Sequence, residues 1–291
     1  MKLFVKELTV IDSSYLCERR GMVGDSWLVD IEMGGELNEM SMLLDFGRVK
    51  KLIKSIIDNE VDHKLLVPAD NALLRRGAQA DGALTVDWLR AGRSIHLHAP
   101  AEAFAFIPGH QIDKESLTAY LMDVLARHLP DNVNDLTLTL RHEKLDGAFY
   151  HYSHGLKKHD GNCQRIAHGH RSPIELYVDG ERDSELEYAF AERWSDIYLG
   201  TREDEVALDS LSLGVDAAVA TAQTHIAFAY VAPQGRFELA MPRGDVEVID
   251  TDTTVELLAH FIAREVKAQV GEKFLKVVAY EGVGKGAIAW A

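Results

Sequence analysis

The chain has 291 residues, of which 47% are hydrophobic and 26% charged, as expected of a globular protein large enough for two domains. Its formal net charge of −15 argues against nucleic acid or an anionic membrane as the main partner, because both bind basic surfaces. Two cysteines cannot build a disulfide framework, no apolar run is long enough to cross a bilayer, and Lys6 and Glu7 interrupt any signal-peptide core. We therefore expect a cytoplasmic protein with no membrane or nucleic-acid partner.

The first half of the chain predicts two strands, two helices and a further strand, in that order. Residues 2–12 and 27–33 read as strands joined by a polar turn. Apolar residues at helical spacing mark a helix over 43–58, and a second helix over 115–129 ends before a proline. The alternating pattern of residues 136–143 predicts a strand.

The second half repeats this order, with an acidic insertion after its first two strands. Residues 253–270 form a clear amphipathic helix pattern, with the apolar residues on one face. Another helix is expected near 209–223. Strands are expected over 148–154, 168–179 and 274–281, and the insertion covers 180–196.

The two halves share a register that indicates a tandem duplication. Glu115 and Glu256 open corresponding helices 141 residues apart, and Glu143 and Glu281 close corresponding strands 138 residues apart. A period near 140 residues is that of a whole β-β-α-α-β-β unit rather than of a short solenoid repeat. No Pro- or Ser-rich linker separates the halves, so we expect them to pack rigidly together. The two units are expected over residues 1–146 and 147–291.

Three of the five histidines within residues 150–170 are spaced for a metal site. His168 and His170 point to the same face of a predicted strand, because alternate side chains do so. His154 ends an alternating aromatic segment, so two neighbouring strands can bring the three imidazoles together. Three neutral imidazoles leave a fourth tetrahedral position open, which is the arrangement of catalytic zinc. Cys163 lies in the connecting loop, close enough to act beside the metal instead of binding it.

Four motifs in this order resemble those of the 6-pyruvoyltetrahydropterin synthase and 6-carboxytetrahydropterin synthase family. The resemblance covers almost the whole chain, as two copies. The motifs are YHYSH ending at His154 with Cys163 and HGH at 168–170, the Asp62–His63 pair behind a DFGRVK helix start, DTTVE at 252–256, and a strand-end glutamate at both Glu143 and Glu281.

The resemblance implies a fold, a cofactor and a set of roles. The fold is α+β, with two tandem T-folds (tunnelling folds) whose antiparallel sheets are backed by helices and associate into a β-barrel in a homo-oligomer. The cofactor is zinc and the substrate is a pterin triphosphate. The implied site comprises His154, His168 and His170 as zinc ligands, Cys163 and His63 as proton carriers with Asp62 orienting His63, Glu281 or Glu143 holding the pterin ring, and Thr253 and Thr254 lining its pocket.

The two copies differ in these site residues. The first has Ser14 where its strand would end in histidine and VGD (23–25) in place of HGH, although Cys17 lies near the expected loop. The second has Thr224–His225 where Asp–His belongs. In the family the active site lies between subunits, and the Asp–His pair meets the zinc site of a neighbour. We therefore expect the second copy to supply zinc and cysteine and the first to supply Asp62–His63, either within one chain or between chains.

Each of these residues also has a structural interpretation. An isolated HGH sequence occurs by chance, and a lone cysteine such as Cys163 is more often an inert buried thiol. The Asp62–His63 pair could end a helix, where the dipole favours an imidazolium, and Glu281 could be a surface acid. The whole set occurring together favours the catalytic interpretation.

The implied function is that of a zinc-dependent lyase acting on 7,8-dihydroneopterin triphosphate. The spacing between Cys163 and His168 is intermediate between the shorter one of carboxy-type enzymes and the longer one of pyruvoyl-type enzymes. We favour 6-carboxy-5,6,7,8-tetrahydropterin as the product, as in queuosine biosynthesis, with 6-pyruvoyltetrahydropterin or non-catalytic pterin binding as alternatives. A metallohydrolase is disfavoured, because no HExxH-like pattern supplies a general-base carboxylate.

Overall fold

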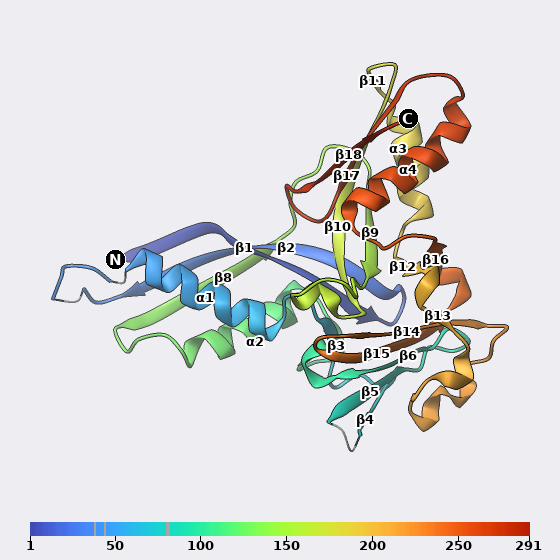
Figure 1. Cartoon of the computed structure of the whole chain (residues 1–291). Coiled ribbons are helices and arrows are strands. Elements are labelled where there is room, and N and C mark those ends of the chain that lie inside the picture. Colours follow the sequence, from blue (N-terminus) through green and yellow to red (C-terminus); the bar gives the residue numbers. More distant parts are fainter. Residues whose placement is uncertain (38, 44, 80–81) are drawn as a thin grey trace.

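The computed structural model describes residues 1–291 except 38, 44 and 80–81, and the described residues form three β-sheets and four α-helices (Figure 1). The expected α+β class is confirmed. Figure 1 shows one helix-backed sheet on the left, a second at the upper right, and a third sheet below their junction.

The first sheet is built around a long antiparallel hairpin, and two helices lie along it (Figure 1). The first helix begins where the Asp45 carboxylate caps the backbone N–H of Arg48, and it buries residues such as Ile53 and Ile57 four positions apart. In spatial order the strands are β7 (Phe104–Ile107), β3 (Leu65–Pro68), β1 (Lys2–Cys17), β2 (Gly21–Gly35) and β8 (Val133–Arg141), and the helices are α1 (Phe46–Glu60) and α2 (Lys114–Ala126).

The second sheet repeats this arrangement around another hairpin. Its helices pack Leu258, Ile262 and Val266 against a core that includes Tyr150 and Trp194. In spatial order the strands are β16 (Val246–Ile249), β12 (Ile197–Thr201), β9 (Phe149–His154), β10 (His168–Val178), β17 (Leu275–Tyr280) and β18 (Gly286–Trp290), with β11 (Glu181–Arg182) paired to β10, and the helices are α3 (Ser184–Arg193) and α4 (Val255–Val270).

The third sheet joins the two halves of the chain. It combines an insertion between β3 and β7 with the corresponding insertion between β12 and β16, and Leu97 of one faces Leu239 of the other in the connecting strand pair. Sequence reasoning assigned no strands to these insertions. Trp88 and Phe228 are buried in a core that both halves share. In spatial order the strands are β13 (Glu205–Val206), β14 (His225–Ala232), β15 (Gly235–Pro242), β6 (Ile95–Pro100), β5 (Ala83–Trp88) and β4 (Leu74–Ala78).

The prediction of a helix near 209–223 is wrong. The segment contains only the 3-10 turns Leu208–Ser210 and Val215–Val219. Gly214 interrupts the pattern, and Val215 is 92% exposed, so no apolar face packs against a core to stabilise a helix.

Two further expectations need correction. The acidic insertion at 180–196 contains the helix α3, whose Phe190 packs into the core of the second unit. The first two sheets are mixed rather than purely antiparallel, because β3 runs parallel to β1 and β7, and β12 runs parallel to β9 and β16. In the described part of the chain, no helix is long and apolar enough to span a membrane.

Candidate active site

The hairpins β1–β2 and β9–β10 touch backbone to backbone, and glycine is required at the point of contact. A Cβ on Gly24 would lie 1.8 Å from the carbonyl oxygen of Tyr152, and a Cβ on Gly169 would lie 2.5 Å from the Cα of Gly24. Beside them the hydroxyl of Ser14 donates to the hydroxyl of Ser153 at 2.6 Å. The glycines at the centres of the VGD and HGH sequences therefore fix how the two halves meet.

The three predicted metal ligands converge next to this contact. His154 ends β9 and pairs in register with His168, the first residue of β10, while His170 follows on the same face. Ring centroids are separated by 4.5 Å for His154 and His168, 5.3 Å for His154 and His170, and 5.6 Å for His168 and His170. One nitrogen from each ring lies within 4.8 Å of the others, so all three can bind one ion.

The hydrogen bonds of His154 and His168 leave one nitrogen of each ring free to bind a metal. The Nδ1 atom of His154 lies 3.0 Å from the hydroxyl of Thr253, and that of His168 lies 3.1 Å from the carbonyl of Arg165. The Nε2 atoms of His154, His168 and His170 are buried without a hydrogen-bond partner. Burying three polar atoms unpaired is unfavourable, and a metal ion would satisfy all three.

The protonation of these rings also suits a metal. Burial lowers the pKa of His154 and of His168 well below its usual value, and the neighbouring imidazoles lower it further. Neutral imidazole is the form that binds metal, so these two ligands need not lose a proton when the ion binds.

Cys163 and His63 lie against the same centre. Cys163 is in the 3-10 turn Asn162–Gln164, and its sulfur lies within 4.8 Å of ring nitrogens of both His63 and His168. The rings of His63 and His168 are 5.1 Å apart. Because His168 belongs to both groups, the pair expected from the first copy and the triad of the second meet within one chain.

Backbone conformation and hydrogen bonds hold His63 in place after α1. His63 adopts a φ of 54°, which is uncommon outside glycine, and its N–H donates to the carbonyl of Asp12 at 2.9 Å. Its Nδ1 lies 2.7 Å from the carboxylate of Asp62. Burial alone would lower the pKa of His63, but Asp62 and Cys163 outweigh it and raise that pKa to about 10.

The four residues expected to bind substrate occupy different environments. Glu281 lies 3.7 Å from Lys285, which is itself 3.4 Å from Asp12 beside the triad. Thr253 is buried and bonded to His154, so its hydroxyl faces a metal ligand rather than an open pocket. Thr254 precedes α4 and is half-buried. Glu143 lies elsewhere, where its carbonyl accepts from the guanidinium of Arg171.

The 6-pyruvoyl tetrahydropterin synthase family model matches the sequence twice, over residues 14–150 and 144–291. The chain belongs to this family. The family comprises lyases of pterin chemistry, and its T-fold occurs here in tandem.

No curated protein matches the sequence. Among solved structures, the 6-pyruvoyltetrahydropterin synthase of Plasmodium vivax is 15% identical over 48% of this chain and 90% of its own, with a TM-score of 0.39. A catalytic-residue mutant of that enzyme gives the same identity and coverage with a TM-score of 0.40. The enzyme of Plasmodium falciparum is 12% identical over 48% of this chain and 97% of its own, with a TM-score of 0.38.

Strand register shows which residues of the two T-fold units correspond, and it corrects two assignments. Ser14 pairs with Gly24 as Ser153 pairs with Gly169, so Tyr15, and not Ser14, stands where the second unit has His154. By the same register, Val23 and Asp25 replace His168 and His170.

The second correction concerns the Asp–His pair. Leu65 and Tyr198 pair with the corresponding residues Ser14 and Ser153, so Asp196 is the counterpart of His63, and both have a positive φ. The Thr224–His225 pair lies instead at the start of β14, where the imidazole of His225 contacts Ser94 in the third sheet.

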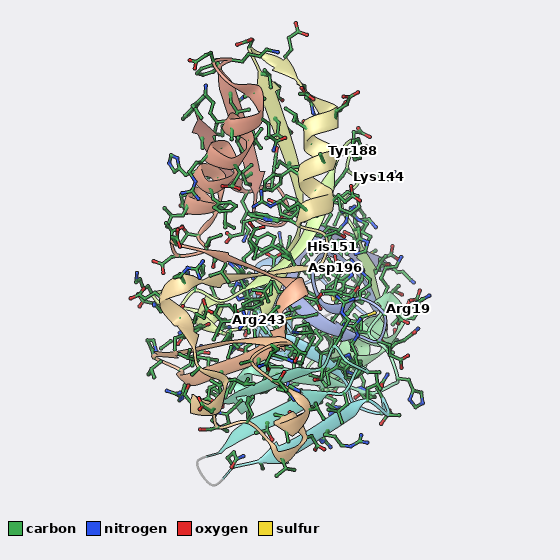
Figure 2. The ribbon with its side chains drawn as sticks, turned by 90° about the vertical axis from the view of Figure 1, so that its right-hand side faces the viewer. Arg19, Lys144, His151, Tyr188, Asp196 and Arg243 are labelled. Carbon is green, nitrogen blue, oxygen red and sulfur yellow. The ribbon has the colours of Figure 1, made fainter. Side chains whose placement is uncertain are left out.

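The mirror site, formed by Tyr15, Arg20, Asp25, His151 and Asp196, is an ion-pair cluster. The guanidinium of Arg20 makes two hydrogen bonds to Asp196, at 2.8 and 2.5 Å, and lies 3.1 Å from the hydroxyl of Tyr15. His151 lies 3.9 Å from the buried carboxylate of Asp25. Figure 2 labels His151 and Asp196 close together at this junction. No metal-ligand group is found here among the described residues.

Sequence reasoning missed the residues that hold the ligands. The carbonyl of Arg165 faces the Nδ1 of His168, and Asp12 lies 3.3 Å from the Nδ1 of His170, although no motif marks either residue. Thr253 was expected to line the pterin pocket, whereas its carbonyl and hydroxyl face the Nδ1 of His154. One signal was available: Asp12 is an acidic residue that directly follows the apolar Val10 and Ile11 in a predicted strand, and a carboxylate buried there requires a partner.

Proposed function

We propose that the protein is a zinc-dependent lyase that converts 7,8-dihydroneopterin triphosphate to 6-carboxy-5,6,7,8-tetrahydropterin. The observation that carries this proposal is the meeting of the histidine triad, Cys163 and the Asp62–His63 pair at one point of a single chain. A pterin-binding protein without activity would not need a thiol, a paired imidazole and three unpartnered ring nitrogens together.

The donor set fits zinc. His154, His168 and His170 would hold the ion through their Nε2 atoms, which are buried and free of hydrogen bonds. Three imidazole nitrogens with an open fourth position are typical of catalytic zinc. When bound, the zinc would supply Lewis acidity toward the hydroxyls of the pterin side chain.

Proton transfer would fall to Cys163 and His63. Cys163 is partly exposed and its sulfur lies beside the rings of His63 and His168, where it could remove a proton from the substrate side chain. His63, held by Asp62, would deliver or take the second proton. Because both groups touch His168, one substrate side chain can reach them without repositioning.

We assign the pterin ring to Glu281 rather than to Glu143. Glu281 is connected to the triad through Lys285 and Asp12, whereas Glu143 lies with Arg171 near the carboxylate of Asp25. A carboxylate can accept two parallel hydrogen bonds from the amino and ring N–H groups of a pterin. Thr254 would border the same pocket, with Thr253 supporting His154.

Product analysis tests this function. The purified protein is incubated with zinc and 7,8-dihydroneopterin triphosphate, and the products are identified by mass spectrometry. We expect 6-carboxy-5,6,7,8-tetrahydropterin. Release of inorganic triphosphate with 6-pyruvoyltetrahydropterin would favour the alternative reaction. The intermediate spacing between Cys163 and His168 is compatible with either reaction. Binding without any product would exclude both lyase reactions.

We further propose a cytoplasmic homo-oligomer. Both cysteines are free, as suits a reducing compartment. Strand β18 lies at the edge of its sheet and exposes Ile288 and Trp290, which suits pairing with a second copy. Light scattering of the purified protein tests this proposal, and a monomer at micromolar concentration would contradict it.

A further inference from the structure

Asp12 of β1 belongs to the N-terminal unit, yet it lies against the metal centre of the C-terminal unit. Its side chain is 4% exposed although it carries a carboxylate. A buried carboxylate is costly unless cations and hydrogen bonds compensate it. The contacts of Asp12 therefore indicate what it is there to hold.

The backbone of Asp12 holds the Asp62–His63 pair from both sides. Its N–H donates to the carboxylate of Asp62 at 2.8 Å, and its carbonyl accepts from the N–H of His63 at 2.9 Å. The second contact helps His63 keep its left-handed backbone conformation. One residue thereby fixes both members of the pair relative to β1.

The side chain of Asp12 faces a metal ligand. One carboxylate oxygen lies 3.3 Å from the Nδ1 of His170 and accepts the hydroxyl of Ser26 at 2.5 Å. The other lies 3.4 Å from the ammonium of Lys285. The contact with His170 falls short of the geometry of a full hydrogen bond, since the Nδ1 of His170 is buried without a hydrogen-bond partner among the described residues.

These contacts determine the tautomer of His170. The carboxylate of Asp12 is buried between the ammonium of Lys285 and the hydroxyl of Ser26, and both contacts suit an ionised carboxylate. An ionised carboxylate can only accept hydrogen bonds, so it favours the proton on Nδ1 of His170 and leaves Nε2 free to face the other two ligands.

We propose that Asp12 is a positioning residue that sets the orientation of His170 and thereby the affinity of the triad for its metal. This inference rests on the metal site of the proposed function. It makes the N-terminal unit, which has no triad of its own, a part of the metal centre of the other unit. Ligand histidines held by carboxylates in this way typically lose about 10–100-fold in metal affinity when the carboxylate is removed.

The test is zinc affinity, measured by competition with a chromophoric chelator and without any pterin. Asp12→Asn keeps the size of the side chain and the backbone contacts but removes the charge. We expect zinc to bind about 10–100-fold more weakly, with an altered absorption spectrum when Co²⁺ replaces zinc. Asp25→Asn is the matched control, since Asp25 is the buried carboxylate of the mirror site, and it should leave zinc affinity unchanged.

Circular dichroism and gel filtration show whether each variant is folded. If Asp12→Asn fails to fold, Ser26→Ala decides the matter, because it removes only the hydroxyl that orients the carboxylate and should weaken zinc binding less strongly. If a folded Asp12→Asn binds zinc as tightly as the wild-type protein, the inference is overturned, whatever the enzyme does to pterins. The same holds for Ser26→Ala if Asp12→Asn does not fold. If Asp12→Asn binds zinc weakly but the wild-type protein shows no lyase activity, the proposed reaction is overturned and this inference still stands. A wild-type protein that binds no zinc overturns both.

Discussion

The metal centre and the mirror site stand at equivalent points of two crossed hairpins, and each holds one carboxylate against one imidazole across the units. At the metal centre the first unit supplies Asp12 and the second supplies His170, with 3.3 Å between their atoms. At the mirror site the first unit again supplies the carboxylate and the second the imidazole, and His151 lies 3.9 Å from Asp25. The acid–imidazole contact is therefore a property of the crossing, and it does not by itself make a metal site.

The other side chains at the two sites explain why they differ. The histidine triad has three imidazoles with unpartnered Nε2 atoms, whereas the mirror site has Tyr15, Val23 and Asp25 at the corresponding positions. The guanidinium of Arg20 beside Tyr15 adds a positive charge that disfavours a second cation. Duplication thus supplied two frameworks, and side-chain identity made one a histidine cluster that could hold a metal and the other an ion-pair cluster.

Removing a ligand should have the largest effect. We expect His168→Ala to release the metal and abolish activity, because two imidazoles cannot retain zinc at this site. Val23→Ala, at the mirror position, should cost some stability through a lost core contact but keep the metal. Elemental analysis should give a single zinc per wild-type chain, and two equivalents, or zinc retained in His168→Ala, would contradict the comparison.

The catalytic pair provides the next contrast. His63→Ala should retain zinc and lose roughly 10²–10⁴-fold in kcat, as expected for a lost acid–base group. Asp196→Ala, its mirror counterpart, should keep full activity and lose about 0.2–1 kcal/mol of stability from the partly exposed pair with Arg20. Unchanged turnover in His63→Ala would remove it from the mechanism.

Mixing variants tests whether one chain builds the site alone. Because His63 and His168 of the same chain are in contact, mixed oligomers of His63→Ala and His168→Ala should regain no activity. Partial recovery after mixing would show that units from different chains assemble the working site.

The two cysteines offer a matched comparison of the same kind. Cys163→Ala should retain zinc and pterin binding and lose about 10²–10⁴-fold in turnover. Cys17→Ala should remain active, because Cys17 ends β1 next to the mirror site and its sulfur joins no metal-ligand group among the described residues. Activity assays with zinc analysis separate these cases, and an active Cys163→Ala would make that thiol a bystander.

The smallest expected effect concerns pH. In the metal-free protein the pKa of His63 is about 10, above the value of about 6.5 for an unfolded histidine. Its pairing with Asp62 and Cys163 therefore stabilises the fold fully below about pH 6.5, and this contribution is lost as the pH rises toward 10. NMR titration of the ring should show a lower pKa in Asp62→Asn, and an identical titration in both proteins would refute the pairing.

Several features followed from the sequence because they depend on local spacing. The tandem arrangement, the helices α1, α2 and α4 and the histidines at 168 and 170 come from periodicity and motif order, and their boundaries agree with the structure to within a few residues. The convergence of His154 with His168 was also predicted, because a hairpin pairs neighbouring segments and its register follows from alternation.

The assignments that failed depend on pairing between distant segments. Ser14 and Thr224–His225 were aligned by motif likeness, and only the ladders of β1 with β2 and of β12 with β9 show that Tyr15 and Asp196 are the counterparts. Because side chains alternate between faces, an error of one residue moves a side chain to the opposite face of the sheet.

By itself the sequence determined the family, the duplication and the candidate site residues, since these depend on residue identity and short-range order. Only the tertiary structure decided that His63 reaches the triad of its own chain, that the two insertions form one sheet, and that Asp12 lies against His170. The physical reason is that glycines at positions 24 and 169 allow two backbones to touch, which brings side chains more than a hundred residues apart within bonding distance.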